Sequence, residues 1–256
     1  MAHRRNNKDL LVELIRTDFK LRYSNSLLGI AWVVMKPMLS FLVLFFIFGA
    51  FRTGFNSKDF APNLLIGIIM FTFVQEGTTF GMTSLLKMAD IILKVSFPRE
   101  LAVLSSVTIS LVNFFINLGV ILVITLLVSF VPNITGIIYF AAIMVLLFVL
   151  VYGSSLYLSI ILIRVRDLEN IIMILFQLLF WGSAIFYDIN TLTGTVGHLV
   201  RLNPIAILID SSRKALLYGQ IINFNKFLIF WVIALIIFLT GRLFFNRQVK
   251  RIAEYF

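Results

Sequence analysis

The sequence predicts an all-α integral membrane protein with six transmembrane helices, and two observations lead to this class. Of the 256 residues, 60% are hydrophobic and only 13% are charged. A soluble domain has about 25% charged residues, so this chain has too few charges to cover a globular surface. The mean hydropathy is +1.01, and the apolar residues gather in six separate runs. Most of these runs are long enough to cross a bilayer. We expect one transmembrane domain over residues 1–256.

The first expected element is an amphipathic helix over residues 8–22. One face carries apolar residues at helical spacing, namely Leu11, Leu14, Ile15 and Phe19, and charged residues occupy much of the rest. This pattern is typical of a helix that lies in the headgroup plane of the bilayer. The alternative is a surface helix of a small N-terminal domain. We favour the interfacial helix because little chain precedes the first apolar run.

The six apolar runs cover residues 29–51, 62–86, 101–130, 136–163, 171–187 and 226–245. A helix rises about 1.5 Å per residue, so about 20 residues cross the hydrocarbon core. The third and fourth runs are long enough to tilt or to extend beyond the bilayer. The fifth is short, and we expect the chain after it to complete the span. Pro37 is expected to kink the first helix or to start its deeper part.

The lysine and arginine residues between the runs predict the orientation. Sixteen of the 22 fall on one side of the topology, namely Arg4, Arg5, Lys8, Arg16, Lys20, Arg22, Lys36, Lys87, Lys94, Arg99, Arg164, Arg166, Arg242, Arg247, Lys250 and Arg251. Basic residues gather on the cytoplasmic side of membrane proteins, so we expect both termini in the cytoplasm. The same rule accounts for the net charge of +10, and nucleic acid is not expected as a partner.

Residues 188–224 form the longest segment on the outer side, and we expect it to be re-entrant. The stretch LNPIAILIDSSRKALLYG within it holds apolar runs too short to span the bilayer. Runs of this length are typical of re-entrant or interfacial helices. Backbone at membrane depth must lie against protein or a water-filled cavity. We therefore predict two short extracytoplasmic helices that dip back beside a pore exit, whereas an ordinary external loop would be less apolar.

A short charged segment, residues 87–100, separates the second and third runs. It combines the charged residues Lys87, Asp90, Lys94, Arg99 and Glu100 with the apolar residues Ile91, Ile92, Val95 and Phe97. Such a mixture is suited to docking a partner protein on the cytoplasmic side, although an ordinary positive-inside loop carries the same charges. Pro98 is expected to end a short helix before the third span begins.

Several kinds of site are not expected. The chain has no cysteine, which excludes disulfides and thiolate ligands. Its two histidines, His3 and His198, are far apart and have no acidic cluster at ligand spacing, so we expect no metal site. Gly49 and Gly54 have the glycine spacing of a P-loop, but the lysine that must follow is absent. We therefore predict no catalytic residue, no cofactor on this chain and no ATP site of the P-loop type.

Residues within two of the runs are candidates to line a transport path. Glu76 lies near the middle of the second run, where a carboxylate costs about 2.5–3.5 kcal/mol and should face a cavity or a partner. The alternative is a hydrogen-bonded residue in helix packing. The fifth run supplies the aromatic candidates Phe176, Phe180, Trp181 and Tyr187. Flat aromatic faces suit sugar rings, although aromatic residues also face lipid in many membrane proteins.

Three stretches, taken together, resemble one protein family. They are RYSNSLLGIAWVVMKP at 22–37, LLKMADIILKVSFPREL at 85–101 and LNPIAILIDSSRKALLYG at 202–219. They are similar to the permease subunits of ABC exporters for cell-surface polysaccharides, which include the O-antigen, capsule and teichoic-acid permeases. The O-antigen permeases are the nearest likeness, and the resemblance covers essentially the whole chain in order.

This resemblance implies a six-span half-transporter in the bacterial inner membrane. Two copies pair as a homodimer, and two copies of a separate ATPase bind beneath them and hold the ATP and Mg²⁺. The N-terminal helix also touches the ATPase. Residues 87–100 correspond to the coupling helix of the family, which assigns ATPase contacts to Lys87, Asp90, Ile91, Lys94, Phe97, Pro98, Arg99 and Glu100.

The substrate implied by the resemblance is a polysaccharide attached to undecaprenyl diphosphate, which crosses through a channel in the homodimer. Basic residues near the cytoplasmic surface are candidates to attract the diphosphate headgroup. They are Arg4, Arg5, Arg16, Arg22 and Lys36. Each of them taken singly is also explained as a membrane-surface charge that contacts lipids.

Other functions compete with polysaccharide export. An ABC permease for a small lipid or a drug would need no continuous aromatic-lined channel. A membrane enzyme that acts on polyprenyl-linked sugars would need clustered acids or histidines at one membrane face, and the acids here are scattered. An ion-coupled carrier would show inverted repeats with broken helices, and we find no convincing repeat.

Overall fold

The computed structural model describes the chain except for residues 1–6, 25–26, 52–58, 90–96, 128–132 and 250–256. The described residues form helices and their connections, without a strand. The helices are α1 (Asn7–Tyr23), α2 (Ala31–Phe51), α3 (Phe60–Lys87), α5 (Glu100–Leu127), α6 (Ile134–Arg164), α7 (Leu168–Trp181), α8 (Gly194–Leu202), α9 (Pro204–Tyr218) and α10 (Phe224–Gln248).

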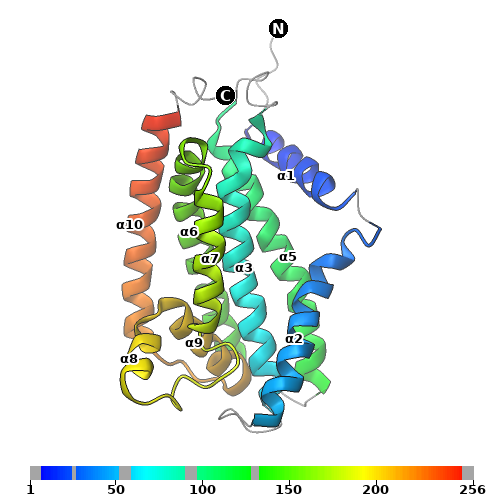
Figure 1. Cartoon of the computed structure of the whole chain (residues 1–256), viewed down its shortest axis with the longest axis vertical. Helices are drawn as coiled ribbons and strands as arrows, with labels where there is room; N and C mark the ends of the chain where they lie inside the picture. Colours follow the sequence, from blue (N-terminus) through cyan, green and yellow to red (C-terminus); the bar gives the residue numbers. More distant parts are fainter. Residues whose placement is uncertain (1–6, 25–26, 52–58, 90–96, 128–132, 250–256) are drawn as a thin grey trace.

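The long helices run side by side as a bundle with α3 at its centre (Figure 1). α3 contacts α2, α5, α6, α7 and α9. In its candidate membrane-crossing stretch 72% of the residues are buried, against 17% in that of α10. The core of the molecule therefore forms around α3, whereas α10 stands at the edge of the bundle and presents a mostly apolar surface.

Glycine residues let α3 come close to its neighbours. A Cβ atom at Gly77 would lie only 2.7 Å from Ser110 Oγ of α5, and one at Gly81 would collide with Ser155 of α6. The hydroxyl of Ser110 donates to the carbonyl oxygen of Val107 in its own helix at 2.7 Å. Lipid tails are as apolar as leucine, so helices in a membrane associate through close packing of small residues. The sequence therefore builds its centre from glycine and serine.

Five of the described helices are long and apolar enough to cross a membrane, namely α2, α3, α5, α6 and α10. They confirm the all-helical membrane class and correspond to the first four and the sixth of the predicted runs. The fifth run, predicted over 171–187, is helical only as far as Trp181. α7 has 14 residues and so covers about 21 Å, less than the roughly 30 Å hydrocarbon core.

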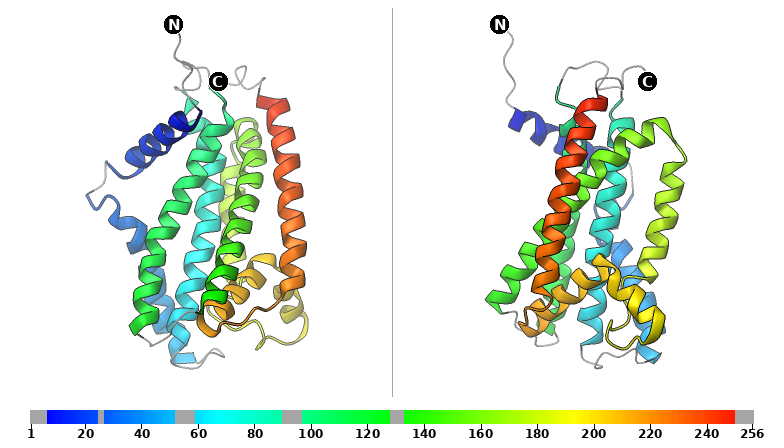
Figure 2. Two further views of the ribbon diagram at one scale, coloured as in Figure 1. Left: turned by 180° about the vertical axis from the view of Figure 1, so that it is seen from behind. Right: turned by 90° about the vertical axis from the view of Figure 1, so that its left-hand side faces the viewer.

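The end of α7 has a local cause. Gly182 follows the last helical residue, and Ala184 has a φ angle of 53°, a left-handed conformation that no residue inside an α-helix adopts. The chain then runs into α8 and α9, which occupy the segment predicted as two short helices. They lie at the end of the bundle opposite α1, and α9 packs against α3 and α6 (Figures 1 and 2).

The start and end of α9 follow from its sequence. Asn203 Oδ1 accepts a hydrogen bond from the Ile205 amide at 2.9 Å, so Asn203 caps the helix. Pro204 occupies the first turn, where an N–H group would have no acceptor within the helix, so proline costs no hydrogen bond there. Gly219 ends the helix with a φ angle of 65°, which costs glycine no strain.

Arg213 anchors α9 inside the bundle. It is 2% exposed, and its guanidinium donates to the carbonyl oxygens of Asn63 at 2.8 Å, of Ala184 at 2.7 Å and of Ile185. These bonds tie α9 to α3 and to the chain that follows α7.

The helix α1 lies obliquely beside α5, near the end of the bundle where α3 ends, α5 begins and α10 ends (Figure 2). The predicted helix over 8–22 is confirmed as α1 (Asn7–Tyr23), and its place in the headgroup plane stays a prediction. Asp18 is 6% exposed and accepts a hydrogen bond from Ser106 Oγ of α5 at 2.7 Å. The amphipathic helix is therefore attached to the bundle by a buried charge as well as by its apolar face.

Candidate functional site

Two hollows border α2. The first, which we call the polar cavity, has a volume of about 430 Å³ and is lined by Asp18, Leu21, Arg22, Tyr23, Trp32, Val33, Lys36, Glu76, Phe80 and Lys87. The second, which we call the apolar groove, has a volume of about 530 Å³ and is lined by Leu39, Ser40, Val43, Leu44, Ile47, Phe48, Phe180 and Trp181. The two hollows follow each other along α2, since residues 32–36 line the first and residues 39–48 line the second.

The wall of the polar cavity that belongs to α1 is built on an ion pair. Arg22 donates to both carboxylate oxygens of Asp18, from Nε at 2.9 Å and from Nη2 at 3.1 Å. The guanidinium carbon also lies 3.9 Å from the centre of the Phe80 ring of α3, which is the geometry of a cation–π contact. Because two partners hold Arg22, its charge has a fixed position in the cavity wall.

Glu76 lies on the α3 side of the polar cavity and is held by α5. Its Oε2 accepts a hydrogen bond from Asn113 Nδ2 at 2.9 Å, and the same amide nitrogen lies 2.9 Å from the hydroxyl of Tyr23. Burial raises the pKa of the Tyr23 hydroxyl, so the phenol stays neutral and keeps its hydrogen. One buried asparagine thus links α1, α3 and α5 at the cavity.

Lys36 enters the polar cavity from a bend in α2. Pro37 lies inside this helix and has no N–H for the carbonyl oxygen of Val33, four residues earlier. Asn117 of α5 supplies the missing donor, with its Nδ2 atom 3.2 Å from that oxygen. α5 therefore stabilises the bend that Pro37 imposes, and the residue next to the bend is the lysine that lines the cavity.

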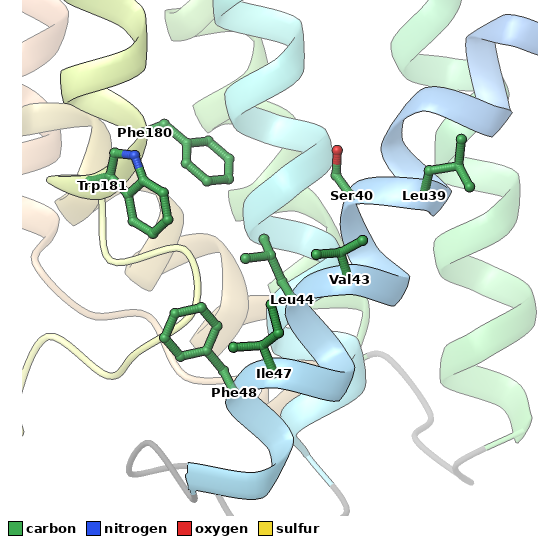
Figure 3. Close-up of a pocket in the computed structure, with 8 residues that line it drawn as sticks. All are labelled: Leu39, Ser40, Val43, Leu44, Ile47, Phe48, Phe180 and Trp181. Atoms are coloured by element: carbon green, nitrogen blue, oxygen red, sulfur yellow. The ribbon is translucent and has the colours of Figure 1, made fainter.

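The apolar groove lies between α2 and α7 (Figure 3). Leu44, Ile47 and Phe48 of α2 face Trp181 of α7 across it. Trp181 is 52% exposed, and Phe48 stacks on Phe186 with ring centres 4.3 Å apart. The groove is a wide apolar surface with aromatic edges, of the kind that accepts lipid chains or sugar faces without fixed hydrogen bonds.

The residues that the sequence predicts to line a channel lie in different environments. Phe180 and Trp181 line the apolar groove, whereas Phe176 is buried against Phe71 of α3. The hydroxyl of Tyr187 donates to the carbonyl oxygen of Trp181 at 3.0 Å. Glu76 belongs to the polar cavity and not to the aromatic surface. Whether these residues line a channel stays a prediction.

The predicted ATPase-coupling residues are only partly within the described residues. Asp90, Ile91 and Lys94 lie outside them. Of the others, Lys87 and Pro98 are exposed and Phe97 packs partly against the core.

Arg99 and Glu100 have partners inside the chain. Arg99 donates to the carbonyl oxygen of Val249 at 2.5 Å. Glu100 pairs with Arg242 at 3.3 Å and accepts a hydrogen bond from Tyr152 at 2.9 Å. These contacts fasten the start of α5 to α6, to α10 and to the residue that follows α10.

The residues predicted to attract the diphosphate headgroup lie in different places. Arg4 and Arg5 lie outside the described residues. Arg16 is an exposed residue that approaches Glu13 to 3.9 Å, away from either hollow. Arg22 and Lys36 both line the polar cavity, and the structure adds Lys87 to them.

Sequence reasoning missed the role of the polar residues behind the cavity. It did not single out Asp18, Asn113 or Asn117. One signal was available for Asp18, because Arg22 follows it four residues later on the same helix face. The two asparagines stand four residues apart in an apolar run, and polar residues at this spacing share one face of a membrane helix.

Comparison with known proteins places these features in a wider setting. The sequence model of a family described as ABC-2 type transporter matches residues 9–217. An O-antigen export system permease protein RfbA of Klebsiella pneumoniae is 26% identical over 246 residues, which cover 96% of this chain and 94% of that protein. A protein of the same description from Myxococcus xanthus is 24% identical over 206 residues, which cover 80% of this chain and 78% of that protein.

Proposed function

The chain belongs to the ABC-2 type transporter family, and from this membership we propose that it is the permease of an ATP-driven polysaccharide exporter. The proposed cargo is a polysaccharide linked to undecaprenyl diphosphate and similar to O-antigen, and the membrane is the bacterial inner membrane. The observation that carries the proposal is the alignment of O-antigen export permeases with 96% of this chain. The chain is a membrane permease subunit without a P-loop, so a separate subunit hydrolyses the ATP.

The two hollows along α2 support this cargo. A lipid-linked glycan combines a charged diphosphate, an apolar tail and sugar rings. The polar cavity offers cationic side chains near α1, and the apolar groove offers aromatic and aliphatic side chains further along the same helix. A headgroup at the cavity and an apolar or sugar portion at the groove would therefore meet matching chemistry in one orientation.

The proposed topology has six spans and both termini in the cytoplasm. α7 serves as the fifth span, and the segment with α8 and α9 completes it by dipping back from the outer side. Two features support this arrangement: the buried anchor of Arg213 on α3 and the contacts of α9 with α6. They keep α8 and α9 beside the membrane-crossing helices, where backbone polar groups must have protein partners.

The proposed ATPase docks at the opposite end of the bundle, in two copies beneath a homodimer of the permease. Residues 87–100 and α1 form the docking surface, and ATP with Mg²⁺ binds to the ATPase. The exposure of Lys87 and Pro98 supports this placement. The ion pair of Glu100 with Arg242 also supports it, because a push on the start of α5 is then transmitted to α10.

The homodimer is proposed to enclose the channel between the α2–α7 faces of two copies. The exposed apolar side chains Leu39, Val43, Ile47 and Trp181 support this choice.

Deletion of the gene tests the function in the cell. We expect lipid-linked glycan to accumulate on the cytoplasmic side and surface polysaccharide to be lost, both restored by a plasmid copy of the gene. Extraction of undecaprenyl-linked glycans followed by mass spectrometry measures the first effect. Unchanged surface polysaccharide in the deletion strain would contradict the proposal and favour a permease for a small lipid or a drug.

A further inference from the structure

The charges in the polar cavity do not cancel in pairs. Three cationic residues line it, namely Arg22, Lys36 and Lys87, together with the carboxylates Asp18 and Glu76. Asp18 is paired with Arg22, since both of its oxygens accept from that guanidinium, and one also accepts from Ser106. In the part of the chain that the structure describes, neither Lys36 nor Lys87 has a carboxylate within ion-pair distance.

The second carboxylate does not neutralise both lysines. Glu76 Oε2 is bound to Asn113, which holds the carboxylate against α5. Glu76 can balance the charge of only one of the two lysines that line the cavity. The cavity therefore keeps at least one net positive charge, supplied from two different helices.

The size and position of the cavity fit an anionic lipid headgroup. A water molecule occupies about 30 Å³, so about 430 Å³ has room for a much larger group. The cavity lies beside α1, the oblique helix near one end of the bundle (Figure 1). Trp32 is also in its lining, and tryptophan is enriched at the level of lipid headgroups.

From these observations we propose that the polar cavity binds the diphosphate of the lipid-linked cargo. Lys36 and Lys87 contact the phosphate oxygens from α2 and α3, and Arg22 is a fixed charge behind them. An ammonium group offers three N–H donors, and a partly enclosed site strengthens charge attraction. Two linked phosphates reach two lysines on separate helices better than one phosphate does. This inference rests on the proposed function for the identity of its ligand.

The cavity includes only some of the basic residues that the sequence indicated as headgroup candidates. Arg16 approaches Glu13 at the exposed side of α1 and takes no part in the site. Two of the five N–H donors of Arg22 are bound to Asp18, and this carboxylate offsets its charge. Among the described residues Lys36 and Lys87 have no carboxylate within ion-pair distance, so we expect the two lysines to decide the affinity.

Binding of undecaprenyl diphosphate to the purified permease in detergent tests the proposal. The variants K36Q and K87Q remove one charge each, and K226Q is the matched control at the other end of the molecule, where Lys226 is exposed near the start of α10. Each cavity variant should weaken binding about fivefold and K226Q should not change it. The permease is measured alone because Lys87 is also a predicted ATPase contact, and unchanged unfolding midpoints show that the variants are folded.

Competition with phosphatidic acid separates the cargo from ordinary membrane lipids. Weak competition supports the diphosphate assignment. Binding by K36Q and K87Q at the wild-type level, an equal loss in K226Q, or full displacement by equimolar phosphatidic acid would each overturn it. The deletion experiment distinguishes this inference from the proposed function. Unchanged surface polysaccharide in the deletion strain would contradict the proposed function, even if the purified permease binds undecaprenyl diphosphate through the lysines. Loss of export in the deletion strain, together with wild-type binding by K36Q and K87Q, would contradict only this inference.

Discussion

At the scale of single residues, the polar side chains inside this bundle hold elements together that apolar packing alone would leave free to slide. Arg213 reaches three carbonyl oxygens on two segments, and Asp18 binds α1 to α5. Asn113 joins α1, α3 and α5. In an apolar surrounding an unpaired carbonyl or carboxylate is costly, so each of these contacts specifies where its helix lies.

Among these residues, we expect replacement of Arg213 to lower the free energy of unfolding most. The variant R213M keeps an unbranched apolar side chain but removes the guanidinium, which leaves the carbonyl oxygens of Asn63, Ala184 and Ile185 without their donor. We expect the free energy of unfolding to fall by about 3 kcal/mol or more, since each buried unpaired group costs about 1–3 kcal/mol. Titration with denaturing detergent, followed by tryptophan fluorescence, measures the change.

The matched control for this residue is K214M, at the next position of α9, whose side chain is partly exposed. We expect it to unfold close to the wild type. An R213M variant as stable as K214M would show that the three hydrogen bonds do not anchor α9.

At the scale of elements, α2 is bent because its sequence contains a proline, and α5 is shaped to receive the bend. The carbonyl oxygen of Val33 has lost its donor to Pro37 and gains the amide of Asn117 instead. The bend separates the part of α2 that lines the polar cavity from the part that lines the apolar groove. The contact between α2 and α5 therefore sets the relative positions of the two hollows.

A double-mutant cycle tests this compensation between helices. N117L alone should cost about 1–3 kcal/mol of unfolding free energy, because the Val33 carbonyl oxygen is then buried without a donor. P37A restores the N–H of residue 37, so N117L should cost clearly less in the P37A background. Equal costs in both backgrounds would mean that Asn117 does not replace the missing donor, and the cycle separates this term from other effects of either change.

The close crossing of α6 and α10 depends on two glycines. A Cβ atom at Gly241 would lie 2.6 Å from the carbonyl oxygen of Gly153, and one at Gly153 would lie 2.7 Å from Cα of Phe238. Backbone atoms stand in the way on both sides, so no side-chain movement can relieve the overlap.

We therefore expect G241A to force α10 away from α6 and to lower the unfolding midpoint by several degrees. G119A is the control, since a Cβ atom at Gly119 of α5 meets nothing within 4 Å and alanine favours a helix more than glycine does. Thermal unfolding in detergent compares the two variants. A midpoint for G241A at or above that of G119A would contradict the close crossing.

The elements that the sequence predicted well are those whose signal is long and repeated. Apolar runs of 20 residues or more correspond to α2, α3, α5, α6 and α10, and the amphipathic pattern of 8–22 corresponds to α1. The end of α7 was missed because residues 182–187 carry no charge and follow the apolar run directly. Gly182 was the local signal for the end of the helix, and the structure adds the left-handed backbone of Ala184, with a φ angle of 53°.

The candidate site was predictable in its charges but not in its grouping. Glu76, Arg22 and Lys36 were each recognised singly, yet nothing local in the sequence indicates that they share one cavity. Their meeting depends on long-range packing of α1 and α2 on α3. For the same reason, the sequence did not indicate that Glu100 pairs with Arg242, which follows it by more than a hundred residues.

At the scale of the whole molecule, the two ends and the sides of the bundle have different chemistry. One end carries α1, the start of α5 and the end of α10, where the described basic residues Arg22, Arg99, Arg164 and Arg242 gather. The other end carries α8 and α9. The sides are apolar, and the α2–α7 side is hollowed. This asymmetry suits a permease that takes energy and cargo at one end and releases the cargo at the other.

Transport by the reconstituted proteins tests the central claim most directly. The permease and the ATPase encoded beside it are placed in vesicles, radiolabelled undecaprenyl-diphosphate-linked glycan is supplied on the ATPase side, and the label that becomes protected inside the vesicles is counted. We expect protected glycan to accumulate only when ATP, Mg²⁺ and both proteins are present. Accumulation without the ATPase, or none with the complete set while ATP is hydrolysed, would contradict this account.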